Sequence, residues 1–264
     1  MTLTDANLPD HRQAGAAERS AALAALFDPT TFRHLEGFGV GPGWRCWEVG
    51  AGGTTVVSWL AKKVGPTGKV VVTGLDPSWA AVPARPPVQL RLHDVSVEEP
   101  PGEGFDLVHA RLVLAEVPDC ARALRTMAKA LRPGGRLLVE DFDLALQPLV
   151  CPDEHGPEHQ LANRLRQALR QLLAGRGADL AFGRGLPRLL RAAGLRRVEA
   201  DAYFPVTSSA CAALEATTTR QIRDELISAG LATAQEIDRH LGNIAAGAMD
   251  LAAPPMISAW GRRV

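Results

Sequence analysis

The chain has 264 residues, of which 46% are hydrophobic and 22% charged, as in an ordinary globular protein. Its 29 lysines and arginines balance 29 acidic residues, which disfavours a broad phosphate-binding surface, so we expect no nucleic-acid partner. The polar N-terminus, the four cysteines without CxxC spacing and the lack of an apolar run of about 18 residues predict a cytoplasmic protein without secretion signal, disulfide framework, Cys-based zinc site or membrane partner.

Alternating strand-like and helix-like segments predict an α/β fold with a doubly wound sheet. The apolar runs that we expect to form strands span residues 45–49, 69–75, 88–92, 105–110, 136–142, 196–206 and 255–262. The segments with helical composition or spacing span residues 16–27, 30–38, 54–64, 119–131, 155–173, 186–193, 208–230 and 233–249. We place the break between the first two helices at Asp28 and Pro29, and the Pro-Gly-Gly sequence at 133–135 ends the helix at 119–131.

A glycine-rich turn, with the sequence EVGAGG at residues 48–53, follows the first predicted strand. Small residues there let the backbone approach a ligand and present N–H groups to it, as Rossmann-type sheets do for nucleotide-like cofactors. Asp76, at the end of the second predicted strand, can accept hydrogen bonds from both hydroxyls of a ribose. The alternative for Asp76 is a turn or helix-capping aspartate.

Two further signals follow the third and fourth predicted strands. Asp94 can accept the exocyclic amine of adenine, with the Val95 N–H nearby, although a turn aspartate is an equal alternative. The fourth strand ends at His109 and Ala110, where main-chain carbonyls can bind the ammonium group of a cofactor that carries an amino acid. The order and spacing of these signals indicate one cofactor site.

Together these motifs resemble those of the class I S-adenosylmethionine-dependent methyltransferases, over about residues 44–142. The matching sequences are EVGAG at 48–52, LD at 75–76, HDV at 93–95, FDLV at 105–108 and LRPGGRLLV at 131–139. Within that family the chain is most similar to the ubiquinone/menaquinone C-methyltransferases and to methyltransferases of bacterial antibiotic pathways. The resemblance implies a seven-stranded Rossmann-like sheet in the order 3-2-1-4-5-7-6 with strand 7 antiparallel, S-adenosylmethionine as cofactor and S-adenosylhomocysteine as product.

The resemblance also implies roles at the methionine end of the cofactor. Gly50, Ala51 and Gly52 would line the methionine moiety, and Glu48 would orient the turn. Ala110 would bind the ammonium group. The chain departs from the family pattern because the third glycine of the turn is replaced by threonine at position 54.

At the nucleoside end, the resemblance implies that Asp76 and Pro77 hold the ribose. Asp94 and Val95 would contact the adenine. Arg111 can contact a carboxylate of cofactor or substrate, and a structural ion pair is an equal alternative.

Methyl transfer needs a general base only for a poorly ionised acceptor. The paired histidines that are common after the fourth strand in the family are replaced here, and a base role can pass to Glu116. Our catalytic candidates are Glu116, Asp141 and His155, each with a surface or capping role as the alternative; Asp143 and His159 are further candidates. We expect no metal; the alternative is a metal site formed by His155 with His159 or by Asp141 with Asp143.

We expect one domain, with an N-terminal helical cap at 1–40 and a methyltransferase domain at 41–264 that carries cap insertions near 150–193 and 208–250. The cap would shape a pocket for a small organic acceptor, methylated on O, N or C in bacterial secondary metabolism by a monomer or homodimer. One alternative is an NAD(P)-dependent oxidoreductase, which would use Gly50 and Asp76 but leaves Asp94 unexplained. Another is a protein of this fold that is non-catalytic or catalyses a non-methylating reaction such as a cyclisation.

Overall fold

The computed structural model describes residues 15–50, 54–75 and 85–264. Its helices are α1 (Ala16–Gly37), α2 (Thr54–Val64), α3 (Cys120–Ala130), α4 (Gly156–Gly175), α5 (Phe182–Ala192), α6 (Ser209–Gln221), α7 (Arg223–Ser228) and α8 (Ala234–Ala245), with the 3₁₀ helix η3 (Leu114–Glu116). Its strands are β1 (Arg45–Val49), β2 (Lys69–Gly74), β3 (Val88–Leu92), β4 (Phe105–Arg111), β5 (Leu131–Phe142), β6 (Arg196–Tyr203) and β7 (Met256–Arg262).

Two compact units divide the chain. The strand unit comprises Asp28–Asp141, Phe182–Ala202 and Met256–Val264. The helical unit comprises Phe142–Ala181 and Tyr203–Pro255 together with the N-terminal residues through Phe27. Helices α2, α3 and α5 therefore belong to the strand unit, and α4, α6, α7 and α8 belong to the helical unit.

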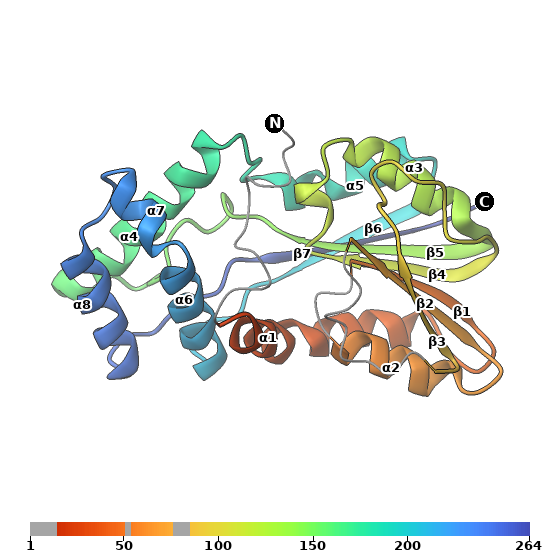
Figure 1. The fold of residues 1–264 in the computed structure, drawn as a ribbon, viewed down its shortest axis with the longest axis horizontal. Helices are drawn as coiled ribbons and strands as arrows, with labels where there is room; N and C mark the ends of the chain where they lie inside the picture. Colours follow the sequence, from red (N-terminus) through yellow and green to blue (C-terminus); the bar gives the residue numbers. More distant parts are fainter. Residues whose placement is uncertain (1–14, 51–53, 76–84) are drawn as a thin grey trace. The chain divides into compact units, whose positions relative to one another are not determined.

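The seven strands form one sheet in the order β3-β2-β1-β4-β5-β7-β6 (Figure 1), which confirms the predicted order. Strand β1 pairs in parallel with β2 and β4, β2 with β3, and β4 with β5. Strand β7 is antiparallel, as predicted. Backbone hydrogen bonds join Gly134 to Arg263 and Asp143 to Pro255, so the start of β5 lies beside the end of β7.

Helices cover both faces of the sheet in the strand unit, with α2 on one face and α3 and α5 on the other (Figure 1). Val70 and Val72 of β2 pack into the core beside α2, whereas Val71 packs into the core beside α3 and α5. This alternation follows from the two-residue period of a strand. Because both faces are covered, the inner strands β1, β2 and β4 are buried along most of their length, whereas the edge strands β3 and β6 are largely exposed.

Helix α1 corrects one expectation. We predicted two helices that meet at Asp28 and Pro29, but α1 runs from Ala16 to Gly37 with Pro29 inside it. Proline removes one backbone hydrogen bond from a helix interior. Phe27 and Leu35, on either side of the proline, are both buried, and this packing offsets the loss.

The helical unit has its own core, to which Leu165 of α4, Leu226 of α7 and Ile237 of α8 contribute. The single helix predicted at 208–230 is wrong, because α6 ends and α7 begins at Ile222. Ile222 is buried in this core, so packing causes a break that no glycine or proline marks. In the described parts of the chain, no helix combines the length and apolar character that crossing a membrane requires.

Strand β5 begins earlier than predicted, at Leu131 rather than at residue 136. The pairing of β4 with β5 shifts register between Phe105 and Leu107, so the Pro-Gly-Gly sequence lies within an irregular part of the strand. Gly134 has a φ of +79°, which favours glycine there. The Pro-Gly-Gly sequence therefore lies inside β5, and α3 already ends at Ala130, before this sequence begins.

Candidate functional site

The residues predicted to bind a cofactor that the structure describes all belong to the strand unit. Val49 at the end of β1 is paired with Thr73 of β2 and with Ala110 of β4, and Ala110 is paired with Val139 of β5. Parallel strands place their carboxyl ends at one edge of a sheet, which is where ligands of open α/β sheets bind. The predicted residues at the ends of β1, β3, β4 and β5 therefore share that edge.

Gly50 holds the turn after β1 in a conformation that glycine adopts freely. Its φ is +66°, and its N–H donates to the Thr73 carbonyl at 2.8 Å. A Cβ atom at position 50 would lie 2.4 Å from Cγ2 of Val113, too close for any side chain without displacement. Because Gly50 has no side chain, its backbone can pass close to Val113 in the segment after β4. Ala51 and Gly52, the rest of the predicted turn, lie outside the described residues.

Asp94 and Val95 follow β3. The Asp94 Oδ1 atom accepts hydrogen bonds from the backbone N–H and the hydroxyl of Ser96, at 2.8 and 2.5 Å. This carboxylate therefore stabilises its own turn, as in the alternative weighed from the sequence. Val95 is buried, and the contact of both residues with adenine stays a prediction. Asp76 and Pro77, predicted to hold the ribose, lie outside the described residues.

Arg111, at the end of β4, has two partners in α1. Its Nη2 forms an ion pair with Asp28 at 2.8 Å, and its Nη1 donates to the Thr31 hydroxyl at 3.1 Å. The structural ion pair weighed from the sequence is therefore present, and a contact of Arg111 with cofactor stays a prediction. Ala110 is buried, and Leu112 just beyond it has a φ of +56°. Backbone strain of this kind is concentrated at functional sites.

A buried network of polar side chains, which we did not predict, surrounds His109. The His109 Nδ1 atom lies 2.7 Å from Glu48 Oε2, and Nε2 lies 3.3 Å from Glu140 Oε2. The hydroxyls of Thr31 and Ser258 donate to the two oxygens of Glu140, at 2.5 and 2.6 Å. Each of these five side chains is buried, so the charged groups are stabilised by one another and by the two hydroxyls rather than by water. We call these five residues the His109 network.

The carboxylates decide the protonation of His109. Burial lowers the pKa of His109, but the charges and hydrogen bonds of Glu48 and Glu140 outweigh burial and raise it to about 9. Burial likewise raises the pKa of Glu140, but its bonds and charge interactions, chiefly with His109, lower it to about 2. At neutral pH the ring therefore carries a proton on both nitrogens. The sequence signal that could have revealed this network was an ionisable residue among apolar neighbours near the carboxyl end of each of three strands, Glu48 in β1, His109 in β4 and Glu140 in β5.

Glu116 and Asp141, two of the catalytic candidates, lie on neighbouring segments of the strand unit. Glu116 is the last residue of η3, and the backbone N–H of Ala115 donates to Asp141 Oδ2 at 3.2 Å. Asp141 is buried and holds this turn, whereas Glu116 is only half-buried. The structure brings Asp141 to the turn that carries Glu116, and the role of either carboxylate as a base stays a prediction.

His155, the third catalytic candidate, belongs to the helical unit and precedes α4. Its side chain is 79% exposed, and its Nε2 lies 3.2 Å from Asp153 Oδ1. The backbone N–H of His155 donates to His159 Nδ1 at 2.8 Å, so the second histidine binds the start of the helix. Among the described residues, no group of three His, Cys, Asp or Glu side chains is placed to hold a metal ion.

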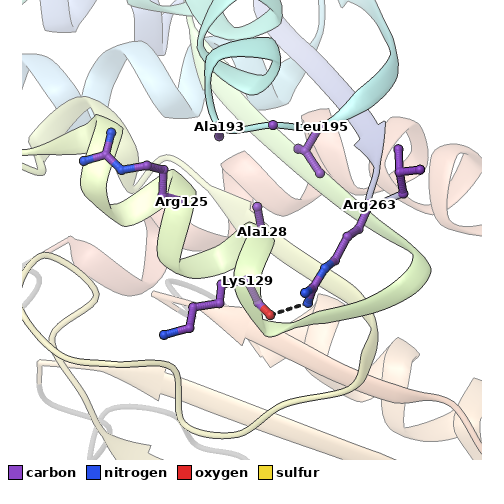
Figure 2. Close-up of a pocket in the computed structure, with 8 residues that line it drawn as sticks. Arg125, Ala128, Lys129, Ala193, Leu195 and Arg263 are labelled. Atoms are coloured by element: carbon purple, nitrogen blue, oxygen red, sulfur yellow. Dashed lines mark hydrogen bonds between the residues drawn. The ribbon is translucent and has the colours of Figure 1, made fainter.

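A hollow of about 410 Å³ lies elsewhere in the strand unit (Figure 2). It is lined by the end of α3, the segment after α5 and the end of the chain, through Arg125, Ala128, Lys129, Ala193, Gly194, Leu195, Arg263 and Val264. Arg263 Nη1 donates to the Lys129 carbonyl at 2.5 Å, which caps the end of α3. Because α3 leads directly into the start of β5, this hollow lies at the amino edge of the sheet and contains none of the predicted site residues.

Comparison with known proteins identifies the family. Residues 11–200 match the family model described as "Methyltransferase domain". Methyltransferase str2 of Strobilurus tenacellus is 38% identical over 103 residues, 37% of this chain and only 35% of that protein. The ubiquinone/menaquinone biosynthesis C-methyltransferase UbiE of Hahella chejuensis is 28% identical over 180 residues, 57% of this chain and 71% of that protein.

Among solved structures, a putative methyltransferase from an antibiotic biosynthesis pathway of Anabaena variabilis has the same fold. Its TM-score is 0.58 at 15% identity, covering 88% of this chain and 96% of that one. The family model spans most of the present chain and favours a methyltransferase over the oxidoreductase weighed from the sequence. With the observed strand order, the match establishes that the chain belongs to the class I S-adenosylmethionine-dependent methyltransferases.

Proposed function

We propose that this protein transfers a methyl group from S-adenosylmethionine to an O, N or C atom of a small organic acceptor. The family match over residues 11–200 carries the proposal. The geometry at Gly50 fits it, because a Cβ there would fill the space between the turn and Val113. A role in bacterial secondary metabolism is part of the proposal and rests on the resemblance of the sequence to antibiotic-pathway methyltransferases.

S-adenosylmethionine supplies a methyl group that is already activated by its bond to a sulfonium, so positioning by the protein can provide much of the catalysis. We assign binding of the methionine end of the cofactor to Gly50, Ala51 and Gly52. Glu48 would orient this turn. The Ala110 carbonyl would accept a hydrogen bond from the ammonium group. The bare backbone at Gly50 permits the close approach that this assignment requires.

For the nucleoside end, we assign the ribose to Asp76 and Pro77 and the adenine to Asp94 and Val95. Asp94 is already held by Ser96, which fixes the direction of its carboxylate before a ligand binds. Arg111 is held by its ion pair with Asp28, so we assign it a supporting role at the end of β4.

Glu116 is our first candidate for a general base, which the reaction needs only if the acceptor is poorly ionised. Its side chain is half-buried, whereas the buried Asp141 uses one oxygen to hold the turn at Ala115. We therefore assign Asp141 to positioning η3 and Glu116 to proton removal. His155, exposed at the start of α4, is the third candidate.

Calorimetric titration of the full chain with S-adenosylhomocysteine tests the cofactor, with NAD⁺ as the comparison ligand. We expect S-adenosylhomocysteine to bind and Asp76→Ala to weaken it by about tenfold or more, a loss of about 1.4 kcal/mol. Asp238→Ala, at an exposed ion pair of the helical unit, is the control and should bind as the wild type does. Binding of NAD⁺ in place of S-adenosylhomocysteine would overturn the assignment.

An acceptor screen by mass spectrometry then tests the reaction. A product heavier than its acceptor by one CH₂ unit, formed only with S-adenosylmethionine present, is the expected result. Glu116→Gln should lower the rate most with acceptors that carry a poorly ionised hydroxyl or amine, because only those need a base. A product of unchanged mass would instead support the non-methylating alternative.

A further inference from the structure

The His109 network joins five elements of the strand unit. Strand β1 contributes Glu48, β4 His109 and β5 Glu140, while α1 contributes Thr31 and β7 contributes Ser258. Their exposed fractions lie between 0 and 5%. Hydrogen bonds shielded from water in this way are stronger than surface ones, and a missing partner is costly.

His109 has a carboxylate at each end of its ring. Nδ1 lies 2.7 Å from Glu48, and Nε2 lies 3.3 Å from Glu140. A ring held at both nitrogens cannot turn without breaking both contacts, so its orientation is defined by two strands other than its own. The Nδ1 contact and the Nε2 contact lead to different parts of the strand unit.

The Nδ1 contact leads to the predicted cofactor edge. Glu48 and His109 are register partners on adjacent parallel strands, and the next pair along is Val49 with Ala110. Gly50, with its bare backbone, follows directly. The bond between Glu48 and His109 therefore fixes the strand ends two residues before Gly50 and one residue before Ala110.

The Nε2 contact leads to Glu140, the register partner of Arg111, and from Glu140 to contacts with α1 and β7. Glu140 accepts hydrogen bonds from Thr31 and Ser258, so this side of the ring ties β4 to β5, α1 and β7. Thr31 also accepts a hydrogen bond from Arg111. These bonds hold the strand unit together, and none of them involves Glu48 or Gly50.

We propose that His109 is a positioning residue for the cofactor: its bond to Glu48 holds the ends of β1 and β4 at the separation that the methionine end of S-adenosylmethionine requires, while its bond to Glu140 serves the stability of the fold. This inference rests on the function proposed above. His109 acts through Glu48 and the backbone at Gly50 and Ala110, and does not itself touch the cofactor.

Two substitutions separate the two contacts. The amide nitrogen of asparagine lies near the position of Nδ1, so His109→Asn keeps a donor for Glu48. The amide nitrogen of glutamine reaches the position of Nε2, so His109→Gln keeps a donor for Glu140. His109→Gln leaves Glu48 without the donor on residue 109, and His109→Asn leaves Glu140 with Thr31 and Ser258 as its donors. Both variants also remove the buried positive charge between the two carboxylates, so both should unfold at a lower temperature than the wild type.

The affinities for S-adenosylhomocysteine should differ between the two. We expect the Kd of His109→Asn to stay within about threefold of the wild type and that of His109→Gln to rise by about tenfold or more. Affinity that falls equally in both variants, in proportion to their loss of thermal stability, would overturn the inference. So would a His109→Gln protein that binds as tightly as the wild type.

A milder pair of variants keeps the test open if both His109 variants fail to fold. Glu48→Gln preserves side-chain shape and removes the charge beside Nδ1, so it should weaken binding several-fold. Ser258→Ala removes a donor to Glu140 and should lower stability without changing the Kd; the reverse pattern would overturn the inference. A wild type that binds no S-adenosylhomocysteine would overturn the proposed function and this inference with it, an outcome distinct from every pattern above.

Discussion

Replacing Gly50 by alanine tests the close approach of the turn after β1 to the segment after β4. The added methyl group would lie 2.4 Å from Cγ2 and 3.3 Å from Cγ1 of Val113, at a φ of +66°. Gly65 is a matched control, because its φ is +65° and no described atom lies within 4 Å of an added Cβ. The two variants share the same backbone strain and differ only in the steric clash.

The magnitudes follow from these two contributions. A left-handed backbone costs a residue with a Cβ about 1–2 kcal/mol, which is the loss of unfolding free energy expected for Gly65→Ala. Overpacking costs a further 1–3 kcal/mol or so, so Gly50→Ala should lose about 2–5 kcal/mol in total. In the protein the methyl group can be accommodated only by moving Val113 or the turn, so cofactor affinity should fall as well.

A double-mutant cycle with Val113→Ala isolates the clash. In that background the nearest remaining atom of residue 113, its Cβ, lies 3.5 Å from the new methyl group, which is an ordinary contact. Urea unfolding should therefore show that Gly50→Ala costs about 1–3 kcal/mol less in the Val113→Ala protein than in the wild type. Calorimetry with S-adenosylhomocysteine should show weaker binding for Gly50→Ala and unchanged binding for Gly65→Ala.

Equal losses for the two glycine variants would refute the reasoning, since the clash would then contribute nothing. Failure of Val113→Ala to relieve the cost would refute it in a different way, by showing that the obstruction lies elsewhere. A Gly50→Ala protein that is destabilised but binds S-adenosylhomocysteine normally would separate the turn from the cofactor and contradict its assignment.

Two further predictions concern buried charges. Because the pKa of His109 in the folded protein, about 9, lies above its ordinary value of 6.5, its stabilisation is complete below pH 6.5 and is lost as the pH rises through 9. Urea denaturation across that window should show a loss of about 3 kcal/mol, and His109→Asn should flatten the profile; a flat wild-type profile would contradict this. In the helical unit, Glu215 pairs with Arg166 at 2.5 Å with both side chains buried, so Glu215→Gln should cost about 3 kcal/mol or more by leaving a buried cation. Asp238→Asn, which breaks an exposed pair with Arg223, should cost far less, and equal losses in a denaturant titration would show that burial does not matter here.

The sequence by itself determined most of the strand unit. The strand at Arg45–Val49, the helix at Thr54–Val64 and the strand at Val88–Leu92 have the bounds that were predicted. Strands covered on both faces need apolar residues throughout, and this leaves a local pattern that can be read without knowledge of distant contacts. The left-handed backbone at Gly50 was equally readable, because glycine is the residue that adopts this conformation freely. The strand order came from the family resemblance, since local pattern does not contain it.

Only the tertiary structure decided how distant polar groups meet. His109 is 61 residues from Glu48 and 31 from Glu140 along the chain, and the three become neighbours because β4 lies between β1 and β5 in the sheet. The residue pattern of a segment reports only the preference of that segment for helix, strand or turn. The protonation of a buried histidine ring depends instead on charges that other strands bring to it. The same reason applies to α1, which continues through Pro29 because packing of the residues around it outweighs a local preference to end the helix.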